Sequence, residues 1–395
     1  MRILVLHNTY QESGGEDAVV AAENALLMRG GHDVHLEIVS NDSIQGLLSK
    51  LHTFLTTPHS ARRKSWMRDL IALHKPDVVH IHNFFPLLTP AIHEAASESG
   101  VAVVQTLHNY RLLCAGALFL RDGSACEKCL VGSNIWSVVH RCYRSSLPGS
   151  VAIFRMQNKA RQQETWQRHV HRFITLTDFA RRKFIAGGLP HTRLSVKPNF
   201  AYNTITSEQN SRIGALFVGR LSPEKGADIL LEAWRNLQHV PLTIAGDGPE
   251  RARLEALAPP HVRFLGQCKP TEVSNMMAKA QALVMPSLCY EGFPMTLVEA
   301  FANNLPVIGS RLGAIEELIE DGITGHHFAP GDAADLTSIA THAFANPARL
   351  SAMGQAARSR YEEHYTPERN LEILEAIYRE AIIEARNHIS TPKDI

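Results

Sequence analysis

The sequence has almost no net charge and no long hydrophobic run. Its formal net charge at pH 7 is +1 over 395 residues, a balance that predicts neither general nucleic-acid binding nor an acidic tail. No apolar run approaches the roughly 20 residues that a membrane-spanning helix needs. The first apolar segment, Met1–His7, is also too short for a secretory signal. These absences predict a cytoplasmic protein that does not bind nucleic acid.

Cysteine is scarce as well, and no Asp-x-Asp pair follows a predicted strand. The six cysteines of a cytoplasmic chain are expected to be reduced or metal-bound rather than joined in disulfides. Carboxylate pairs are the ligands that hard metal ions prefer. Because no such pair is present at a strand end, we expect no catalytic metal.

The length and the order of the predicted elements indicate two α/β domains. A chain of 395 residues exceeds what one hydrophobic core usually holds. Apolar strand patterns alternate with helical patterns, which predicts parallel sheets covered by helices. Strands are predicted at 2–7, 33–39, 77–82, 101–106, 172–177, 215–219, 242–245, 262–265, 282–285 and 307–308.

The clearest domain boundary lies after residues 197–200, where the polar stretch 203–211 precedes a new run of strands. We therefore predict an N-terminal domain at 1–200 and a C-terminal domain at 201–366. Residues 367–395 should form a last helix that crosses back to the N-terminal domain. Within the first domain, one long helix is predicted at about 151–169, and a cysteine-rich insert at about 112–149 interrupts the α/β order.

The stretch Glu291–Glu299 places two carboxylates around a predicted helix start. Glu291 follows the strand at 282–285, and Pro294 suits the first position of a helix because its missing N–H is not needed there. The free N–H groups of a helix N-terminus attract anions. Two carboxylates beside an anion site suit a ligand that has both phosphate and hydroxyl groups. Nucleotide sugars are such ligands.

A second loop in the same domain, Gly219–Gly226, follows a strand and opens a helix. It carries two cations, Arg220 and Lys225. Fixed cations stabilise the negative charge that develops on a diphosphate leaving group as its bond to a sugar breaks. Cations on a loop are more often solvated surface groups. The presence of Glu291–Glu299 in the same domain favours the functional interpretation.

Three motifs in combination resemble glycosyltransferase family 4. They are Gly-Arg-Leu-x-x-x-Lys-Gly at 219–226, Gly-Asp-Gly-Pro at 246–249 and Glu-Gly-Phe-Pro-x-x-x-x-Glu at 291–299. The resemblance covers nearly the whole chain. It implies the GT-B fold, in which two Rossmann-like, doubly wound domains face each other across a cleft. The domain at 1–200 is then expected on the acceptor side, and the domain at 201–366 is expected to bind the nucleotide-sugar donor. The resemblance also implies transfer of a sugar from a nucleotide donor with retention of configuration and without a metal.

The same resemblance implies a role for each residue of the donor site. Arg220 and Lys225 are expected to bind the donor diphosphate, Glu291 the hydroxyls of the donor sugar, and Glu299 the ribose hydroxyls. Carboxylates accept hydrogen bonds from vicinal hydroxyls well. The backbone segment expected to meet the sugar and phosphates is Gly292, Phe293, Pro294, Met295, Thr296 and Leu297.

Two N-terminal features match the family in the same way. The Gly14-Gly15 pair corresponds to a loop near the phosphates and the acceptor. His108 stands at the end of a strand, where the family has a histidine near the sugar. A glycine pair is often only a turn, and a lone histidine is often structural. We expect His108 to form a hydrogen bond to the donor sugar.

Glu291 and Glu299 do not resemble the carboxylate pair of a retaining glycosidase. Those two groups lie about 5 Å apart across one glycosidic bond, whereas Glu299 is predicted more than a turn inside the helix. The resemblance implies a same-face substitution in which the leaving diphosphate helps to deprotonate the acceptor. A nucleotide-sugar epimerase of the same fold and a non-catalytic nucleotide-sugar-binding protein are the alternatives. The epimerase would need acid and base groups around the second carbon of the sugar, and the Glu291–Glu299 pattern fits transfer better. A protein that had lost catalysis should have lost some of the five residues named for catalysis and ribose binding, and all five are present.

Four cysteines in the insert have the spacing C-x11-C-x2-C-x12-C: Cys114, Cys126, Cys129 and Cys142. One CxxC knuckle flanked by single cysteines at similar distances is compatible with a structural zinc. Reduced thiols without a ligand are equally compatible with this spacing. No cofactor is expected to be required for catalysis.

The donor and the acceptor are predicted by chemical class. We expect a UDP- or GDP-sugar donor and a saccharide or lipid-linked saccharide acceptor, in bacterial cell-surface polysaccharide or glycan synthesis. Basic residues at 62–64 lie near Trp66, and others are scattered over 141–161. Such groups are usually a solvated face, but peripheral contact with the cytoplasmic face of the inner membrane is an open alternative.

Overall fold

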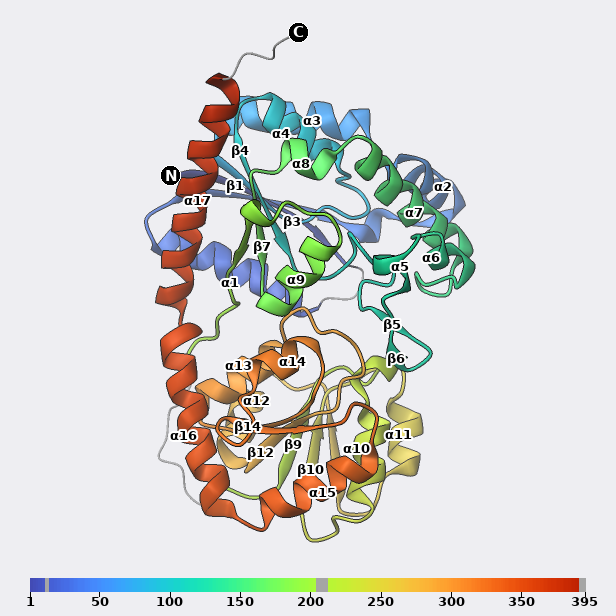
Figure 1. Ribbon diagram of the computed structural model, residues 1–395, viewed down its shortest axis with the longest axis vertical. Coiled ribbons are helices and arrows are strands. Elements are labelled where there is room, and N and C mark those ends of the chain that lie inside the picture. Colours follow the sequence, from blue (N-terminus) through green and yellow to red (C-terminus); the bar gives the residue numbers. More distant parts are fainter. Residues whose placement is uncertain (11–13, 204–211, 391–395) are drawn as a thin grey trace. The chain divides into compact units, whose positions relative to one another are not determined.

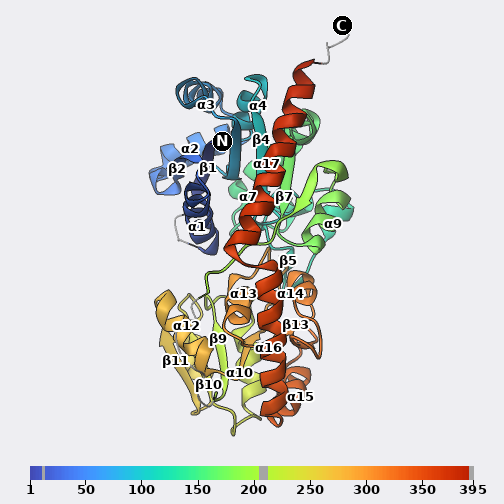
Figure 2. The same cartoon turned by 90° about the vertical axis from the view of Figure 1, so that its left-hand side faces the viewer.

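A computed structural model describes residues 1–10, 14–203 and 212–390 of the chain. It divides into two compact units (Figures 1 and 2). Unit 1 comprises Met1–Ala117, Glu127–Lys197 and Leu371–Ile395, and unit 2 comprises Leu118–Cys126 and Pro198–Asn370. Most of the polar stretch predicted as a domain linker lies outside the described residues, as do the last five residues of the predicted C-terminal helix.

Unit 1 is built on a six-stranded sheet in the order β2-β1-β3-β4-β7-β8, with every pairing parallel. Its central strands are buried on both faces, which explains their continuous apolar pattern in the sequence. The strands are β1 Arg2–Thr9, β2 Asp33–Ser40, β3 Val78–Asn83, β4 Ala102–Leu107, β7 Arg172–Thr175 and β8 Leu194–Val196.

Helices cover the sheet of unit 1, and the last helix of the chain is one of them. α17 contributes Leu374, Ile377 and Tyr378 to the same core as Ile3 and Val78 of the sheet. The helices are α1 Gly15–Arg29, α2 Gly46–Thr56, α3 Ala61–His74, α4 Ala91–Glu98, α5 Lys128–Val131, α6 Trp136–Val139, α7 Leu147–Gln162, α8 Thr165–His169, α9 Asp178–Ala186 and α17 Pro367–Ser390.

The long helix predicted at about 151–169 is in fact two helices, α7 and α8. Glu164 lies between them in the left-handed conformation, with φ 52°. A left-handed residue ends an α-helix, and no proline or glycine in the sequence marks this position. The segment after it folds back as the short α8, whose Trp166 is buried.

Unit 2 repeats the architecture with the strand order β11-β10-β9-β12-β13-β14, again parallel. Its strands are β9 Ala215–Val218, β10 Leu242–Ala245, β11 Val262–Gly266, β12 Ala282–Met285, β13 Val307–Ser310 and β14 Gly325–Phe328. Its helices are α10 Ala227–Trp234, α11 Arg251–Leu257, α12 Pro270–Lys279, α13 Met295–Ala302, α14 Gly313–Leu318, α15 Ala333–Phe344 and α16 Pro347–His364.

Part of the insert predicted for the N-terminal domain groups with unit 2. This part contains a small hairpin, β5 Leu120–Arg121 and β6 Ser124–Ala125. The backbone N–H of Tyr290 donates to the carbonyl of Leu118 at 3.1 Å, and the rings of Tyr290 and Phe119 are 5.8 Å apart. These contacts explain the grouping.

Both sheets have a point where the chain reverses its direction of winding. In unit 1 it lies between β1 and β3, and in unit 2 between β9 and β12. Ligands of such sheets bind beyond the carboxyl ends of the strands at this point. The fold therefore gives each unit one candidate binding edge. None of the helices in the described ranges is long and apolar enough to cross a bilayer.

Candidate active site

The binding edge of unit 2 is formed by three loops that bond to one another. Leu288 in the loop after β12 donates its N–H to the carbonyl of Glu224 in the loop after β9, at 2.9 Å. Leu221 in the loop after β9 donates in turn to the carbonyl of Asp247 after β10, at 2.9 Å. The loops that carry all three sequence motifs are thus joined into one structure.

Two glycines make this close packing possible. Gly226 has φ 66°, and a Cβ there would lie 2.0 Å from the carbonyl oxygen of Pro286. Gly246 has φ 146°, and a Cβ there would lie 1.8 Å from the carbonyl oxygen of Gly219. Any other residue would be strained and would push the loops apart. The glycines of these motifs are therefore structural, and they position the charged residues between them.

The structure brings Lys225 and Glu291 into direct contact. The Lys225 Nζ donates to the Glu291 Oε1 at 2.7 Å, and the Ser287 hydroxyl donates to the same oxygen at 2.8 Å. The two side chains are 29% and 12% exposed, so the pair is largely shielded but open on one side. Lys225 and Glu291 were both predicted from the sequence as site residues. Their contact with each other was not predicted, and neither was the role of Ser287.

The pair is held in its ionised form. Burial alone would lower the pKa of Lys225, but the carboxylate of Glu291 outweighs it and leaves the pKa raised. Burial alone would raise the pKa of Glu291, but the Lys225 ammonium and the Ser287 hydroxyl leave it lowered. Cys289 lies close to both, and burial raises the pKa of its thiol well above the ordinary value. The Lys225 ammonium and the Glu291 carboxylate are therefore both charged near neutral pH, and the Cys289 thiol is neutral.

Glu299 lies apart from this pair, on α13. The helix begins at Met295, with Pro294 as its N-cap rather than its first residue. The Glu299 carboxylate is partly exposed and forms no hydrogen bond or ion pair with any part of the chain that the structure describes. Burial raises its pKa. Arg220 is exposed. Both side chains can therefore reach a ligand.

The binding edge of unit 1 carries three histidines at the ends of three adjacent strands. They are His7 on β1, His82 on β3 and His108 after β4. The Nε2 of His108 lies 2.9 Å from the Nδ1 of His82, and His7 Nε2 lies 2.7 Å from an oxygen of Asp17. Burial and the neighbouring His82 lower the pKa of His108 well below its usual value. Its imidazole is therefore neutral.

A neutral His108 suits the role predicted for it. A neutral imidazole has one donor and one acceptor nitrogen. The Nε2 bonds to His82, and the Nδ1 has no hydrogen-bond partner within the described ranges. The Nδ1 can therefore form a hydrogen bond with a hydroxyl of a ligand. His82, which fixes the ring, was not predicted as a functional residue.

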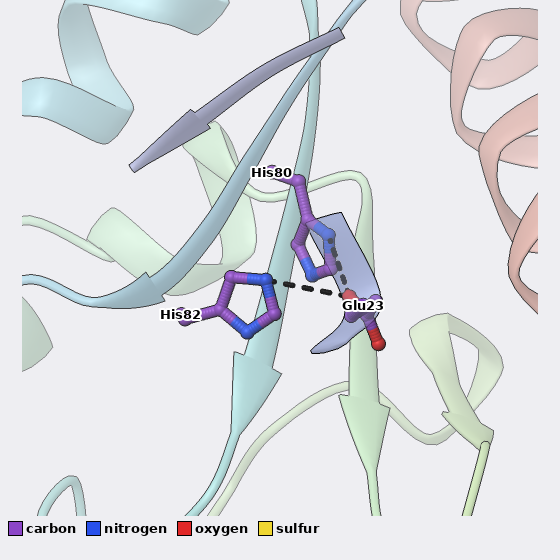
Figure 3. A group of neighbouring side chains, drawn as sticks. All are labelled: Glu23, His80 and His82. Atoms are coloured by element: carbon purple, nitrogen blue, oxygen red, sulfur yellow. Dashed lines mark ion pairs between the residues drawn. The ribbon is translucent and has the colours of Figure 1, made fainter. Parts of the chain in front are cut away.

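Beneath His82 lies a buried cluster of charged and polar groups (Figure 3). The Glu23 Oε1 is 3.5 Å from the His80 Nδ1 and 3.3 Å from the His82 Nε2. The other Glu23 oxygen accepts from the Lys197 ammonium at 2.6 Å. These contacts hold the pKa of Glu23 well below its usual value against the opposing effect of burial.

The distances within this cluster would admit a metal ion, but its chemistry does not favour one. The Lys197 ammonium already neutralises Glu23 and would repel a cation. Both nitrogens of His80 are also in use, at 2.7 Å from the Tyr378 hydroxyl and at 2.7 Å from the Thr106 hydroxyl. We interpret the cluster as a buried support that holds His82 in place through its contact with Glu23.

The Gly14-Gly15 pair begins α1, but its backbone conformation does not require glycine. A Cβ at either position would meet no atom within 4 Å. The Gly14 N–H donates to the Asp17 carboxylate at 3.0 Å, so a phosphate would compete with this bond. Binding of the donor phosphates by Gly14 and Gly15 stays a prediction.

Glu16, the next residue of α1, was not singled out from the sequence. It accepts from the Tyr10 hydroxyl at 3.1 Å, and Asn109 donates to the same hydroxyl at 3.2 Å. Burial raises the pKa of Glu16 to about 7. A carboxyl group that titrates near neutral pH at a binding edge is a candidate functional group.

The four cysteines of the insert differ in burial. Cys114 is buried, whereas Cys126, Cys129 and Cys142 are partly exposed. Among the described residues, the groups whose ligand atoms lie close enough to share a metal contain histidine and glutamate only. A structural zinc at the four cysteines stays a prediction.

Two of the four Lys and Arg residues of the basic helix α3 are paired with carboxylates of their own unit. Lys64 pairs with Glu94 at 3.1 Å and with Glu98 at 2.7 Å, and Arg68 pairs with Glu98 at 2.8 Å. These bonds leave less positive charge on this face than the sequence predicted. The arginines at 141, 144, 155 and 161 are exposed.

Comparison with known proteins shows the family. Residues 25–201 match the profile described as Glycosyltransferase Family 4, and residues 204–360 match that of Glycosyl transferases group 1. The chain belongs to glycosyltransferase family 4. The family predicted from the three motifs is thereby confirmed.

Curated relatives match this family 4 chain over part of their length. A glycogen synthase of Mycobacterium tuberculosis is 34% identical over 154 residues, which is 37% of each chain. A phosphatidyl-myo-inositol mannosyltransferase of Mycobacterium leprae is 32% identical over 173 residues, 41% of this chain and 46% of the relative. The chain thus spans less than half of the length of these relatives.

The fold is shared over nearly the whole chain. The crystal structure of Anabaena Alr3699/HepE in complex with UDP and glucose superimposes with a TM-score of 0.66 at 17% identity. It covers 96% of this family 4 chain and all of the other. The predicted GT-B fold, with two parallel α/β units, is therefore confirmed.

Proposed function

We propose that this family 4 protein is a retaining glycosyltransferase that uses a UDP- or GDP-sugar donor. Its acceptor would be a saccharide or lipid-linked saccharide in bacterial cell-surface glycan synthesis, at the cytoplasmic face of the inner membrane. One observation carries the proposal. The Lys225–Glu291 pair stands at the reversal point of unit 2, with the unpaired carboxylate of Glu299 on the helix that follows.

The charges of this edge match the parts of a nucleotide sugar. Lys225 and Arg220 would hold the diphosphate, whose negative charge grows as the sugar leaves. Glu291 would accept hydrogen bonds from sugar hydroxyls through the side that Lys225 and Ser287 do not occupy. Glu299 would accept from the two ribose hydroxyls. The solved UDP and glucose complex of HepE, which has the same fold, supports a donor of this kind.

The reaction we propose needs no metal and no protein nucleophile. The bond between the anomeric carbon and the diphosphate oxygen breaks, and its electron pair leaves with the diphosphate. The acceptor oxygen bonds to the anomeric carbon on the same face, and its proton passes to an oxygen of the leaving diphosphate. His108 would accept a hydrogen bond from, or donate one to, a sugar hydroxyl. The neutral state of His108 supports this positioning role.

The alternatives receive no specific support. An epimerase would need acid and base groups around the second carbon of the sugar. A protein that had lost catalysis should also have lost some of the site residues, whereas His108, Arg220, Lys225, Glu291 and Glu299 are all present. We therefore put forward sugar transfer alone.

The first test is a thermal-shift screen of the purified protein against UDP, GDP and their sugars. A ligand that binds only the folded state raises the melting temperature with its concentration. The best donor is then incubated with and without EDTA, and the configuration of the product is determined by NMR. Retention with EDTA-resistant turnover is the expected result. Inversion, or a complete loss of turnover that added metal restores, would contradict the mechanism.

A further inference from the structure

Unit 1 contains a large apolar cavity that the proposed reaction does not use. Its volume is about 610 Å³, which is within the range of small-molecule sites. It lies between α2, the loop after β3 and the start of α7. The two helices, α2 and α7, also contact each other. Leu47, Leu51 and Phe54 of α2 line one wall, and Phe85 with Ala152 lines the other.

The helix that forms one wall is unusually apolar on its exposed side. Leu47 and Leu48 are each 83% exposed, and Leu51 and Leu55 are more than half exposed. α2 has no buried residue. Of these four leucines, Leu47 and Leu51 line the cavity, so an apolar ligand in it would remove their side chains from water. Exposed apolar surface of this kind marks an interaction site.

The charged side chains among the lining residues have one sign. Lys50 of α2 and Arg144 line it, and no carboxylate is among its lining residues within the described ranges. Arg144 is exposed and lies beside Tyr143, with 5.7 Å between its guanidinium and the ring. A ligand with a hydrocarbon body and an anionic end would match this lining. Its hydrocarbon would contact the apolar side chains, and its anionic end would pair with Lys50 and Arg144.

The cavity reaches the binding edge of unit 1. Tyr10, which follows β1, lines it, and its hydroxyl donates to Glu16. Phe85 and Pro86 follow β3, the strand on the other side of the reversal point. A molecule in the cavity would therefore have one end near the strand ends of unit 1 and the Gly14-Gly15 loop, which the family resemblance places near the acceptor.

We propose that this cavity binds the hydrocarbon chain of the lipid that carries the acceptor sugar, with its phosphate or diphosphate at Lys50 and Arg144. The proposal rests on the proposed function and narrows its acceptor to a lipid-linked saccharide. A free saccharide would leave the leucines of α2 uncovered. A cavity of this size would enclose one hydrocarbon chain. This mode of binding differs from adsorption of α2 to a bilayer, in which the helix would lie on the surface of many lipids.

The test measures binding of farnesyl diphosphate by calorimetry, with inorganic diphosphate as the chain-free comparison. Leu51→Asp places a charge in the wall of the cavity at an exposed position that tolerates it. Leu73→Asp is the matched control, because Leu73 of α3 is 73% exposed and does not line the cavity. We expect farnesyl diphosphate to bind at least 100-fold more tightly than inorganic diphosphate. Leu51→Asp should lower the affinity for farnesyl diphosphate at least tenfold, whereas Leu73→Asp should leave it unchanged.

Arg144→Glu is a second test variant. It should weaken the binding of farnesyl diphosphate but leave the binding of UDP or GDP in unit 2 unchanged. Equal affinity for the two diphosphates, or no effect of Leu51→Asp, would overturn the proposal. So would binding only to phosphatidylglycerol vesicles with none to farnesyl diphosphate, which would make α2 a membrane-docking helix. Failure of UDP and GDP to bind the wild-type protein would instead count against the proposed function.

Discussion

The ammonium of Lys225 and the carboxylate of Glu291 lie 2.7 Å apart in unit 2, although they are 66 positions apart in the sequence. One comes from the loop after β9 and the other from the loop after β12. The carboxylate keeps the lysine charged and fixes its direction before any ligand arrives. A cation fixed in this way stabilises charge in a transition state without having to reorganise.

Replacing Lys225 should therefore affect turnover more than binding. We expect Lys225→Ala to reduce kcat by about 10²–10³, the effect of removing one preorganised donor from a developing charge. Lys279→Ala, at an exposed position of α12, is the control and should keep wild-type turnover. Steady-state kinetics with the best donor measures both. An unimpaired Lys225→Ala enzyme would remove Lys225 from the diphosphate site.

Glu299 should be a determinant of nucleotide affinity. Hydrogen bonds to a charged group contribute roughly 1.5–3 kcal/mol, so Glu299→Ala should raise the Kd for the nucleoside diphosphate about 10- to 100-fold. Glu232→Ala, on the exposed side of α10, is the control. Calorimetry at pH 8 measures both. An unchanged Kd for Glu299→Ala would reject the ribose contact.

The pH dependence of this affinity has a definite sign. Burial raises the pKa of Glu299, and ribose binding needs its ionised form. Affinity should therefore fall as the pH is lowered through this raised pKa, above the range of an ordinary glutamate. Glu299→Gln should bind more weakly at pH 8 and lose this part of the pH dependence. A wild-type Kd that is constant down to the usual glutamate range would contradict the assignment.

The loops of the binding edge of unit 2 could be predicted because their motifs are local. Gly226 and Gly246 stand next to the residues they position, and a short segment contains both the turn and the charge. The contact between Lys225 and Glu291 could not be predicted, because nothing in either loop specifies the strand order that brings β9 beside β12. The split between α7 and α8 was missed for a related reason, since Glu164 adopts its left-handed conformation without glycine or proline.

The support beneath His108 could not be predicted for a different reason. Glu23 lies on α1 and Lys197 follows β8, and each alone resembles a surface charge. Only the fold shows that both are buried and paired. His80 and His82 stand two apart in β3, and residues two apart in a strand point the same way. Nothing in the sequence indicates that a glutamate faces them.

This buried pair should make a measurable contribution to stability. Removing one partner of a buried pair costs roughly 3–5 kcal/mol, so Lys197→Met and Glu23→Gln should each destabilise the protein by about that amount. The double variant should lose less than the sum of the two, because no lone charge is left buried. Urea denaturation of the four proteins gives the coupling. Strict additivity would mean that the pair is not coupled.

Acid should weaken the same pair in a predictable direction. The pKa of Glu23 is held well below its usual value in the folded state. Its stabilising contribution is therefore present above the unfolded value of about 4.3 and is lost as the pH falls through the folded pKa. In Lys197→Met, Glu23 has lost its ammonium partner, so burial should raise its pKa instead. This variant should recover stability when the pH is lowered from 8 to 5.

Glu16 should have the opposite effect on stability near neutral pH. Its pKa is raised to about 7 in the folded protein, so the folded state binds the proton more tightly than the unfolded state does. Stability from this group is greatest at low pH and is lost as the pH rises through 7. Between pH 5.5 and 8 the change should be about 2 kcal/mol. One oxygen of Glu16 is buried without a hydrogen-bond partner, which adds to the cost of the charge.

Glu16→Gln removes this charge and keeps the shape of the side chain. We expect it to stabilise the protein at pH 8 and to differ much less from wild type at pH 5.5. Urea denaturation at the two pH values measures the difference. Binding of farnesyl diphosphate should be tighter in Glu16→Gln at pH 8 as well, because the carboxylate near the cavity would repel the anionic end of the ligand. A variant that is less stable than wild type at pH 8 would show instead that Glu16 is ionised and satisfied in the folded protein.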